Sequence, residues 1–235
     1  MLIGSLIACS GEAPMPTEPE AHHEAHGARH EGGHEGHPNV DHAHHRFDDV
    51  ERWTKVFDDP ERDAWQRPEE VVAAMAVSPG MTVADIGAGT GYFNPHLAQA
   101  VGPSGHVVAI DIEPNLVAHM TKRAEADGTP QVEARLVQPD AHGLSAGEAD
   151  RVLLVDTYHH IEGREAYFRS LLTAMKPGGE LVIVDLTREA PFGPPPEMRL
   201  SAEQVKTELA SAGWAFVRSV DTLPNQYVVV FTPAG

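Results

Sequence analysis

The amino-acid sequence predicts an α/β fold built on a mostly parallel β-sheet. Short apolar runs, typical of buried strands, alternate with segments of helical periodicity along residues 68–211. Such alternation is typical of parallel strands that are joined by right-handed crossover helices. The last two strand-like segments alternate apolar and polar residues around a short turn, which predicts a β-hairpin and therefore one antiparallel strand.

Two helices are expected before the sheet. Apolar side chains recur at helical spacing over residues 47–57, and the Asp-Asp-Pro run at 58–60 ends this helix. Pro68 suits the first position of the second helix, because its missing N–H has no helical partner there. The Ser-Pro-Gly run at 78–80 ends that helix.

The strands and helices of the sheet region follow in alternation. Strands are predicted over residues 81–86, 105–111, 132–137, 151–155 and 180–186, and helices over 92–100, 114–127 and 164–175. The Lys-Pro-Gly-Gly run at 176–179 predicts a turn into the fifth strand. Ser201 and Gln204 predict a capping box at the start of the last helix. Residues 214–220 and 226–231 form the closing hairpin.

The loop over residues 85–92 carries the sharpest motif. Its glycines let the backbone turn tightly and let a ligand lie against it. A dinucleotide fingerprint needs Gly-x-Gly-x-x-Gly, but here the third glycine comes one place early and Tyr92 fills the expected position. The strand also ends in Asp85, whose carboxylate would repel a pyrophosphate and suit a ligand with an ammonium and a sulfonium. The loop therefore favours S-adenosylmethionine over NAD.

Acidic residues end the next strands as well. Asp111 follows Gly87 by 24 residues, a position from which a carboxylate can accept hydrogen bonds from both ribose hydroxyls. Asp140 follows the third strand, where an acid can receive an adenine amino group. Each acid alone is equally typical of a loop or a helix cap. Together, these acids follow successive strands at the carboxyl edge of one sheet, next to the glycine loop, and this arrangement predicts a ligand site.

With these motifs, residues 67–232 resemble the class I S-adenosylmethionine-dependent methyltransferases, particularly those that methylate quinones and small molecules. The resemblance rests on the loop 85–91, Asp111, Asp140, the strand 150–156 and the run 176–179. It implies a Rossmann-like three-layer sandwich with a seven-stranded sheet of order 3-2-1-4-5-7-6, in which strand seven is antiparallel. It also implies the cofactor S-adenosylmethionine and a small-molecule methyl acceptor.

The resemblance extends to individual residues of the site. It implies that Gly87, Gly89 and Gly91 cradle the methionine and ribose part of the cofactor. It places Asp111 on the ribose, and it places Ile112, Asp140 and Ala141 against the adenine. The expected cofactor-binding set is completed by the loop neighbours Ala88 and Tyr92, by Asp85, and by Asp156 after the fourth strand.

The fourth strand runs into the polar segment 156–160, where the methyl group should emerge. Methyl transfer is an in-line displacement, so the protein mainly aligns the acceptor, and a base helps only when the acceptor must lose a proton. His159 or His160 is a candidate for that base, since histidine titrates near neutral pH, and Tyr158 is a candidate for orienting the acceptor. Alternatively, one histidine holds the loop and the other is exposed. Adjacent side chains diverge, so no metal site is predicted.

Two segments are expected to close the site. The N-terminal segment 46–66 is interpreted as a helical lid in front of the methyltransferase domain over residues 67–235. The proline-rich run 191–199 is the other. Core packing of Trp53 and Trp65, and a plain connector at the proline run, are the alternatives.

Composition limits the substrate class. The formal net charge of −18 argues against a nucleic-acid substrate, since an acidic domain repels phosphate backbones. The single cysteine, Cys9, excludes an intramolecular disulfide and a CxxC site. The single cysteine also argues against arsenite methylation, a chemistry for which several cysteines are expected around the metalloid. No apolar run reaches the length of a transmembrane helix.

The N-terminal residues suggest export. Within residues 1–9, the run Leu-Ile-Ala-Cys at 6–9 resembles a bacterial lipobox, which implies a lipid on Cys9 and a membrane-anchored lipoprotein on the periplasmic side. Residues 1–9 hold no Lys or Arg, unlike the usual signal, so a cytoplasmic protein is the alternative.

The segment 10–45 holds nine of the fifteen histidines and no large apolar run, which predicts a disordered tether. It is either a solvated spacer or a metal scavenger, because imidazoles bind Zn, Cu and Ni. A non-catalytic cofactor- or metal-binding surface lipoprotein is the alternative function.

Overall fold

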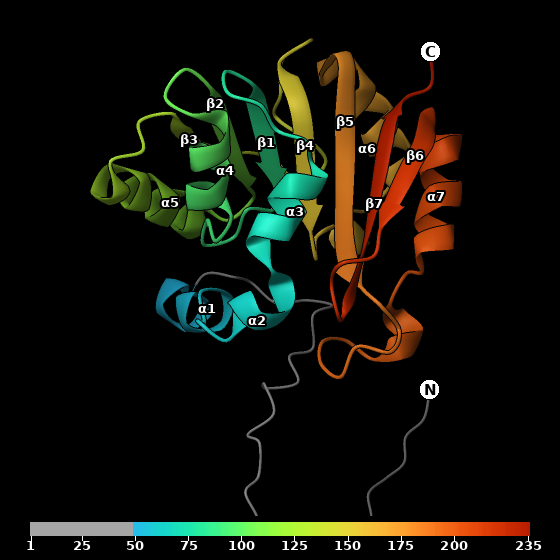
Figure 1. Cartoon of the computed structure of the whole chain (residues 1–235), viewed down its shortest axis with the longest axis horizontal. Coiled ribbons are helices and arrows are strands. Elements are labelled where there is room, and N and C mark those ends of the chain that lie inside the picture. Colours follow the sequence, from blue (N-terminus) through green and yellow to red (C-terminus); the bar gives the residue numbers. More distant parts are fainter. Residues whose placement is uncertain (1–48) are drawn as a thin grey trace, which may run out of the picture. The chain divides into compact units, whose positions relative to one another are not determined.

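The computed structural model describes residues 49–235 (Figure 1). The lipobox at Cys9 and the histidine-rich segment 10–45 lie outside the described residues.

The described chain forms one seven-stranded sheet of order β3-β2-β1-β4-β5-β7-β6. The strands are β1 Thr82–Ile86, β2 His106–Asp111, β3 Val132–Leu136, β4 Ala149–Val155, β5 Met175–Leu186, β6 Trp214–Val220 and β7 Gln226–Pro233. The pairs among β1 to β5 are parallel, and β7 is antiparallel to both β5 and β6. The predicted α/β fold, strand order and antiparallel strand seven are confirmed.

Helices cover both faces of the sheet (Figure 1). They are α1 Val50–Phe57, α2 Arg62–Gln66, α3 Pro68–Ala74, α4 Asn94–Val101, α5 Pro114–Asp127, α6 Arg164–Leu171 and α7 Ala202–Ser211, with 3₁₀ turns η1 Tyr158–His160, η2 Leu172–Ala174 and η3 Pro196–Met198. None of the helices within residues 49–235 is long and apolar enough to span a membrane.

Alternation along the strands produces the two cores. In β4, Val152 and Leu154 pack with α6 and α7 in one apolar cluster, while Leu153 packs with α3 and α4 in another. Because successive side chains of a strand point to opposite faces, a strand covered on both faces is apolar over most of its length. The strands that carry the site are therefore rigidly held, and their carboxyl ends are fixed relative to one another.

Three local predictions need correction. The run 176–179 is not a turn before the strand but part of β5, where the register shifts between the pairs Ala149–Met175 and Arg151–Glu180. Gly178 takes a φ of +75° in this bulge, so the glycines bend the strand instead of ending it. The predicted helix 164–175 tightens after Leu171 into the 3₁₀ turn η2, and Met175 already belongs to β5. Helix α2 lies within the segment 46–66, which was interpreted as a helical lid, but it was not predicted as a separate helix.

Candidate functional site

A cavity of about 340 Å³ opens at the carboxyl ends of β1, β2 and β4. Its walls come from the glycine loop, the strand ends, η1, and segments far away in sequence. Trp53, Phe57, Arg62 and Trp65 of the α1–α2 region line it, as do Phe192–Pro194 after β5. Both segments that were expected to close the site thus reach the cavity.

The glycine loop is folded back onto the end of β2. The backbone N–H groups of Gly87 and Ala88 both donate to the carbonyl of Ile110, at 2.9 and 3.0 Å. Gly87 has a φ of +76°, and a Cβ there would lie 2.4 Å from Thr157 Cγ2. Only glycine fits a left-handed backbone pressed this closely against a neighbouring loop. The motif therefore serves to bring the loop after β1 against the loop after β4.

We expect Gly87→Ala to lower the unfolding free energy by about 2–5 kcal/mol, because positive φ costs about 1–2 kcal/mol and overpacking against Thr157 adds to it. Gly147→Ala is the matched control, since Gly147 has a φ of +64° but no atom within 4 Å of an added Cβ. Urea unfolding of both variants measures the difference. Equal losses in the two would show that the approach to Thr157 imposes no constraint.

Asp111 is set in place by the loop itself. Its Oδ2 accepts from Gly89 N–H at 2.8 Å and its Oδ1 accepts from Glu113 N–H at 3.0 Å. Burial raises the pKa of Asp111, and these backbone donors partly oppose that rise. The carboxylate is thus oriented before any ligand arrives, with further acceptor capacity for ligand hydroxyls.

Asp85, the residue before the last one of β1, is buried, with 2% of its surface exposed. Burial raises the pKa of Asp85 to about 7, and the neighbouring Asp111 carboxylate contributes in the same direction. Such a carboxyl is half-protonated near neutral pH, and a cation beside it would favour the ionised form. Asp85 is suited to a ligand that brings its own positive charge.

Arg62 supplies the opposite charge. It is the one Arg or Lys among the described residues that line the cavity. Its guanidinium lies 4.0 Å from the centre of the Tyr92 ring and donates to the carbonyl of Phe57 at 2.8 Å. Burial lowers the pKa of Arg62, and the carboxylate of Asp156 is the main opposing influence. Sequence reasoning named the segment that holds Arg62 but did not single out this residue.

A chain of hydrogen bonds runs from Arg62 to Asp156. Arg62 Nη2 donates to Gln66 Oε1 at 3.0 Å, Gln66 Nε2 donates to Gln226 Oε1 at 2.6 Å, and Gln226 Nε2 donates to both carboxylate oxygens of Asp156 at 2.9 Å. Both amides are buried. Burial raises the pKa of Asp156 to about 6, and the charge of Asp185 adds to the rise. The chain couples the lid to the acid after β4.

The lid is also fastened to the glycine loop. Thr90 Oγ1 donates to Asp58 Oδ1 at 2.8 Å, and Arg123 of α5 forms an ion pair with the other oxygen of Asp58 at 2.9 Å. The hydroxyl of Tyr92 donates to Asp63. The region between α1 and α2 therefore lies directly over the loop.

The turn η1 brings both histidines to the cavity wall. His159 Nδ1 lies 2.9 Å from Asp185 Oδ2, and the two histidine rings are 4.1 Å apart. Burial by itself lowers the pKa of His159, but the hydrogen bond to Asp185 and the charges of Asp185 and Asp156 outweigh it and raise that pKa above its ordinary value. Asp185, on β5, is a site residue that sequence reasoning missed.

Three expected residues, Tyr158, Asp140 and Gly91, do not line the cavity. Tyr158 is fully buried, its ring stacks on Phe168 at 4.9 Å and its hydroxyl donates to Glu208 at 2.9 Å. It therefore points into the core beneath α6, because the 3₁₀ turn sends successive side chains in different directions. Asp140 is exposed and does not line the cavity.

The other expected residues meet at the cavity. They are Asp85, Gly87, Ala88, Gly89, Tyr92, Asp111, Ile112, Ala141, Asp156, His159 and His160. Gly91 does not line it, and a Cβ there would lie 2.5 Å from Asn94 Nδ2. Within residues 49–235, no group of three or more His, Cys, Asp or Glu side chains is arranged to hold a metal ion.

The comparison with known protein families decides the assignment, for a methyltransferase-domain family matches residues 77–223, more than half of the chain. The chain belongs to this methyltransferase family. The chain is 28% identical to an arsenite methyltransferase of Halobacterium salinarum over 60% of its length. It is 35% identical to the 2-methyl-6-phytyl-1,4-hydroquinone methyltransferase of a Synechocystis species over 53% of its length.

The matched region spans only 35% and 40% of these two relatives. Among solved structures, a SAM dependent methyltransferase from Aquifex aeolicus superposes with a TM-score of 0.73 at 29% identity, covering 78% of this chain and 97% of that one.

S-adenosylmethionine is the cofactor of this fold and family, and the residues present fit it. The glycine loop leaves room at Gly89, where an added Cβ would approach Phe57 at 3.5 Å. Asp85, Asp111 and Asp156 can face the ammonium, the ribose hydroxyls and the sulfonium. Arg62 is the cation suited to the carboxylate of the cofactor.

We expect affinity for S-adenosylmethionine to fall about tenfold between pH 8 and pH 6. The cofactor is cationic and binds better to the ionised form of Asp85. Because the pKa of Asp85 is about 7, this carboxyl is mostly protonated at pH 6 in the free protein. Calorimetric titrations across this range measure the slope. In Asp85→Asn the affinity should be weaker and the slope shallower, and an unchanged slope would assign the effect to another group.

Proposed function

We propose that this chain is an S-adenosylmethionine-dependent methyltransferase whose acceptor is a small neutral molecule that gives up a proton during methyl transfer. The observation that carries the proposal is one cavity that is lined both by the glycine loop with its acids and by His159, which pairs with Asp185. S-adenosylmethionine, when bound, supplies an activated methyl group on a sulfonium.

The residues of η1 and β5 account for the proton. The carboxylate of Asp185 accepts the Nδ1–H of His159, so a neutral imidazole carries its lone pair on Nε2. Nε2 would take the proton of the acceptor atom as that atom forms its bond to the methyl carbon and the bond from this carbon to sulfur breaks, which leaves S-adenosylhomocysteine. Asp185 would stabilise the resulting imidazolium. Asp156 adds negative charge on the same side of the cavity.

The apolar and aromatic side chains that line the cavity support an apolar, aromatic acceptor. Trp65 and Phe192 pack against each other in the cavity wall, with ring centres 4.7 Å apart and planes tilted by 53°, and Ile161, Tyr167 and Leu186 also line the cavity. A flat ring gains area and stacking energy against such walls. With Arg62 assigned to the cofactor, the described lining offers no second Arg or Lys for an anionic acceptor.

Two of the relatives support the same class of acceptor. The Synechocystis relative acts on a hydroquinone, and another, 30% identical over 53% of this chain, is a ubiquinone/menaquinone biosynthesis C-methyltransferase of Ectopseudomonas mendocina. The arsenite methyltransferase is a weaker guide to the substrate, because the only cysteine of this chain is Cys9.

The test is a screen for formation of S-adenosylhomocysteine with simple phenols, hydroquinones, amines and carboxylic acids. We expect turnover with phenols or hydroquinones, and none in Asp111→Asn, which should lose the cofactor. Turnover confined to anionic acceptors would contradict the proposed substrate class. Cofactor binding without turnover of any acceptor would favour a non-catalytic binding protein.

We further propose that Cys9 carries a lipid and that residues 10–45 tether the enzyme to the periplasmic side of a bacterial membrane. The lipobox-like run and the histidine-rich composition support this, and Cys9→Ala should move the protein from the membrane to the soluble fraction. An unmodified Met1–Cys9 segment on cytoplasmic protein would contradict the lipid. Deletion of 10–45 should abolish metal binding and preserve cofactor binding if the histidines are a metal scavenger.

A further inference from the structure

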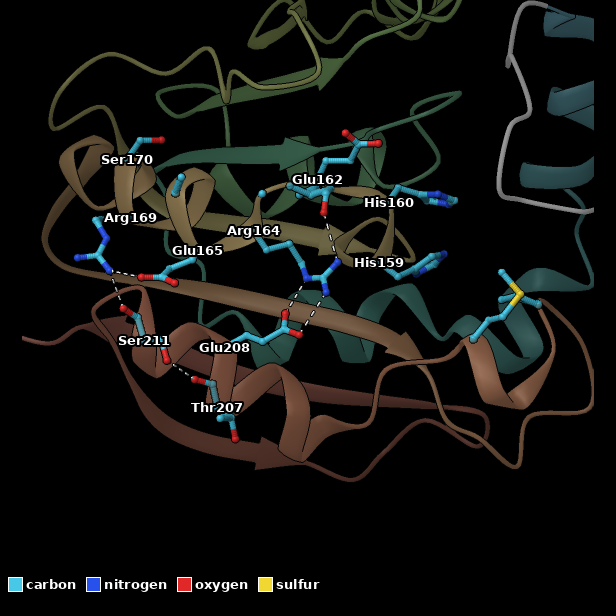
Figure 2. Close-up of a pocket in the computed structure, with 15 residues that line it drawn as sticks. His159, His160, Glu162, Arg164, Glu165, Arg169, Ser170, Thr207, Glu208 and Ser211 are labelled. Carbon is cyan, nitrogen blue, oxygen red and sulfur yellow. Dashed lines mark hydrogen bonds and ion pairs between the residues drawn. The ribbon is translucent and has the colours of Figure 1, made fainter.

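An ion pair between α6 and α7 holds the two ends of η1. Arg164 Nε lies 2.6 Å from Glu208 Oε2, and Arg164 Nη2 lies 3.2 Å from Glu208 Oε1, which is a two-point pairing (Figure 2). Arg164 is the first residue of α6, four residues after His160 at the end of η1, and Glu208 comes from α7, 44 residues later. Both side chains are about one-third exposed.

Each member of the pair also contacts η1 or the residue after it. Glu208 Oε2 accepts from the hydroxyl of Tyr158 at 2.9 Å. Arg164 Nη1 donates to the carbonyl of Ile161 at 3.3 Å. Tyr158 and Ile161 flank His159 and His160, so the backbone that carries the histidines is held on both sides.

The ring of His159 is held from the opposite direction. Its Nδ1 lies 2.9 Å from Asp185 Oδ2 on β5, and the other charged groups that influence its pKa are Asp156 and Arg164. The ring of His160 lies beside it. His159, His160, Arg164 and Glu208 all line one groove, and Figure 2 shows the two histidines to the right of the Arg164–Glu208 pair. A small shift of η1 would lengthen the bond to Asp185, since hydrogen bonds weaken steeply with distance and angle.

The packing of α6 on α7 does not depend on this pair alone. Arg169, one turn further along α6, donates to the carbonyl of Ser211 at 2.9 Å and pairs with Glu165. Phe168, Leu171 and Leu209 join the helices through the apolar core. The contacts that set the Arg164–Glu208 pair apart are those to η1.

We propose that Arg164 and Glu208 are positioning residues, which hold η1 so that His159 stays against Asp185 and presents its other nitrogen to the acceptor. This inference rests on the proposed function, in which His159 takes the proton of the acceptor. Neither residue touches the reacting atoms.

The test asks whether the pKa of His159 rises or falls when Arg164 is replaced in the full-length protein. In the present geometry the charge of Arg164 lowers the pKa of His159, so loss of that charge alone would raise it. Loss of positioning would do the reverse, because the raised value depends on the bond to Asp185. We therefore expect Arg164→Leu to lower the pKa of His159 toward 6.5, the ordinary value. NMR titration follows the ring signals, which His159→Gln assigns.

Three further variants keep the test decisive. Tyr158→Phe removes only one hydroxyl and should shift the titration in the same direction by less, while Arg164→Lys should restore part of the wild-type value. Arg169→Leu, in the same groove, should change nothing. Calorimetry with S-adenosylhomocysteine should give the same affinity in every variant, which shows that the cofactor site is intact.

The steady-state expectation is a fall in kcat of about tenfold or more in Arg164→Leu with little change in KM for the cofactor. A rise or no change in the pKa of His159 in Arg164→Leu would overturn the positioning role. The titration is independent of turnover, so a lowered pKa in a protein that transfers no methyl group would disprove the proposed function while leaving the positioning role supported.

Discussion

His159→Gln is expected to reduce methyl transfer to a hydroxyl acceptor by about 10²–10⁴-fold, the usual contribution of a positioned general base. Glutamine approximates the size of the imidazole and can still bond to Asp185, so affinity for the cofactor should not change. Single-turnover rates and calorimetry separate these two effects. A rate within a factor of three of wild type would remove His159 from the mechanism.

The pH profile of the wild type gives a second view of the same residue. The pKa of His159 is raised in the folded protein, so the neutral base form is populated only as pH rises through that value. The rate should therefore increase with pH to a plateau, with an apparent pKa above 6.5. Asp185→Asn should move this limb to lower pH and reduce the plateau rate, because it removes the carboxylate that raises the pKa and fixes the tautomer. A profile unchanged in Asp185→Asn would contradict the pairing.

Arg62→Leu is expected to weaken binding of S-adenosylmethionine by about 10- to 100-fold, since a charge-assisted bond contributes about 1.5–3 kcal/mol. Loss of the cation weakens cofactor binding in two ways. It removes the partner of the cofactor carboxylate, and it raises further the pKa values of Asp85 and Asp156, which the charge of Arg62 lowers.

The control for Arg62 is a truncated ligand. 5′-Methylthioadenosine lacks the amino-acid end of the cofactor, so its affinity should be nearly the same in wild type and Arg62→Leu. Arg62→Lys should recover part of the loss, although an ammonium cannot reproduce the paired bonds to Phe57 and Gln66. Equal losses for both ligands would indicate that Arg62 supports the lid without contacting the cofactor.

The sheet was predictable because each strand is marked by residues that are close to it in sequence. Each apolar run is bounded by glycine, proline or polar residues, and the period changes from strand to helix along the chain. The glycine loop and the acids after it are adjacent to strand ends, so the alternation alone brings Asp85 and Asp111 to one edge. The order of the strands came from the family resemblance, which the structure confirms.

What could not be predicted depends on contacts between distant segments. The chain from Arg62 to Asp156 passes through Gln226, which is 160 residues from its partner Gln66. Nothing in the sequence near either glutamine marks it as buried. Asp185 sits inside an apolar strand, where its pairing with His159 becomes visible only in three dimensions.

The expected residues that lie away from the cavity do so for equally specific reasons. Tyr158 follows the fourth strand, as the histidines do, but the rotation of the 3₁₀ turn takes it into the core. Asp140 was assigned from its position after the third strand, and the structure leaves it exposed while Pro139 and Ala141 line the cavity. A position along the chain fixes the sheet edge but not the direction of a loop side chain.

The central claim is that the glycine loop and its acids bind S-adenosylmethionine. Calorimetric titration of the full chain with the cofactor, beside the double variant Asp85→Asn, Asp111→Asn, tests it most directly. We predict a Kd in the micromolar range for the wild type and no measurable binding in a folded double variant. A folded wild type that does not bind the cofactor, or a double variant that binds it equally well, would contradict this assignment of the site.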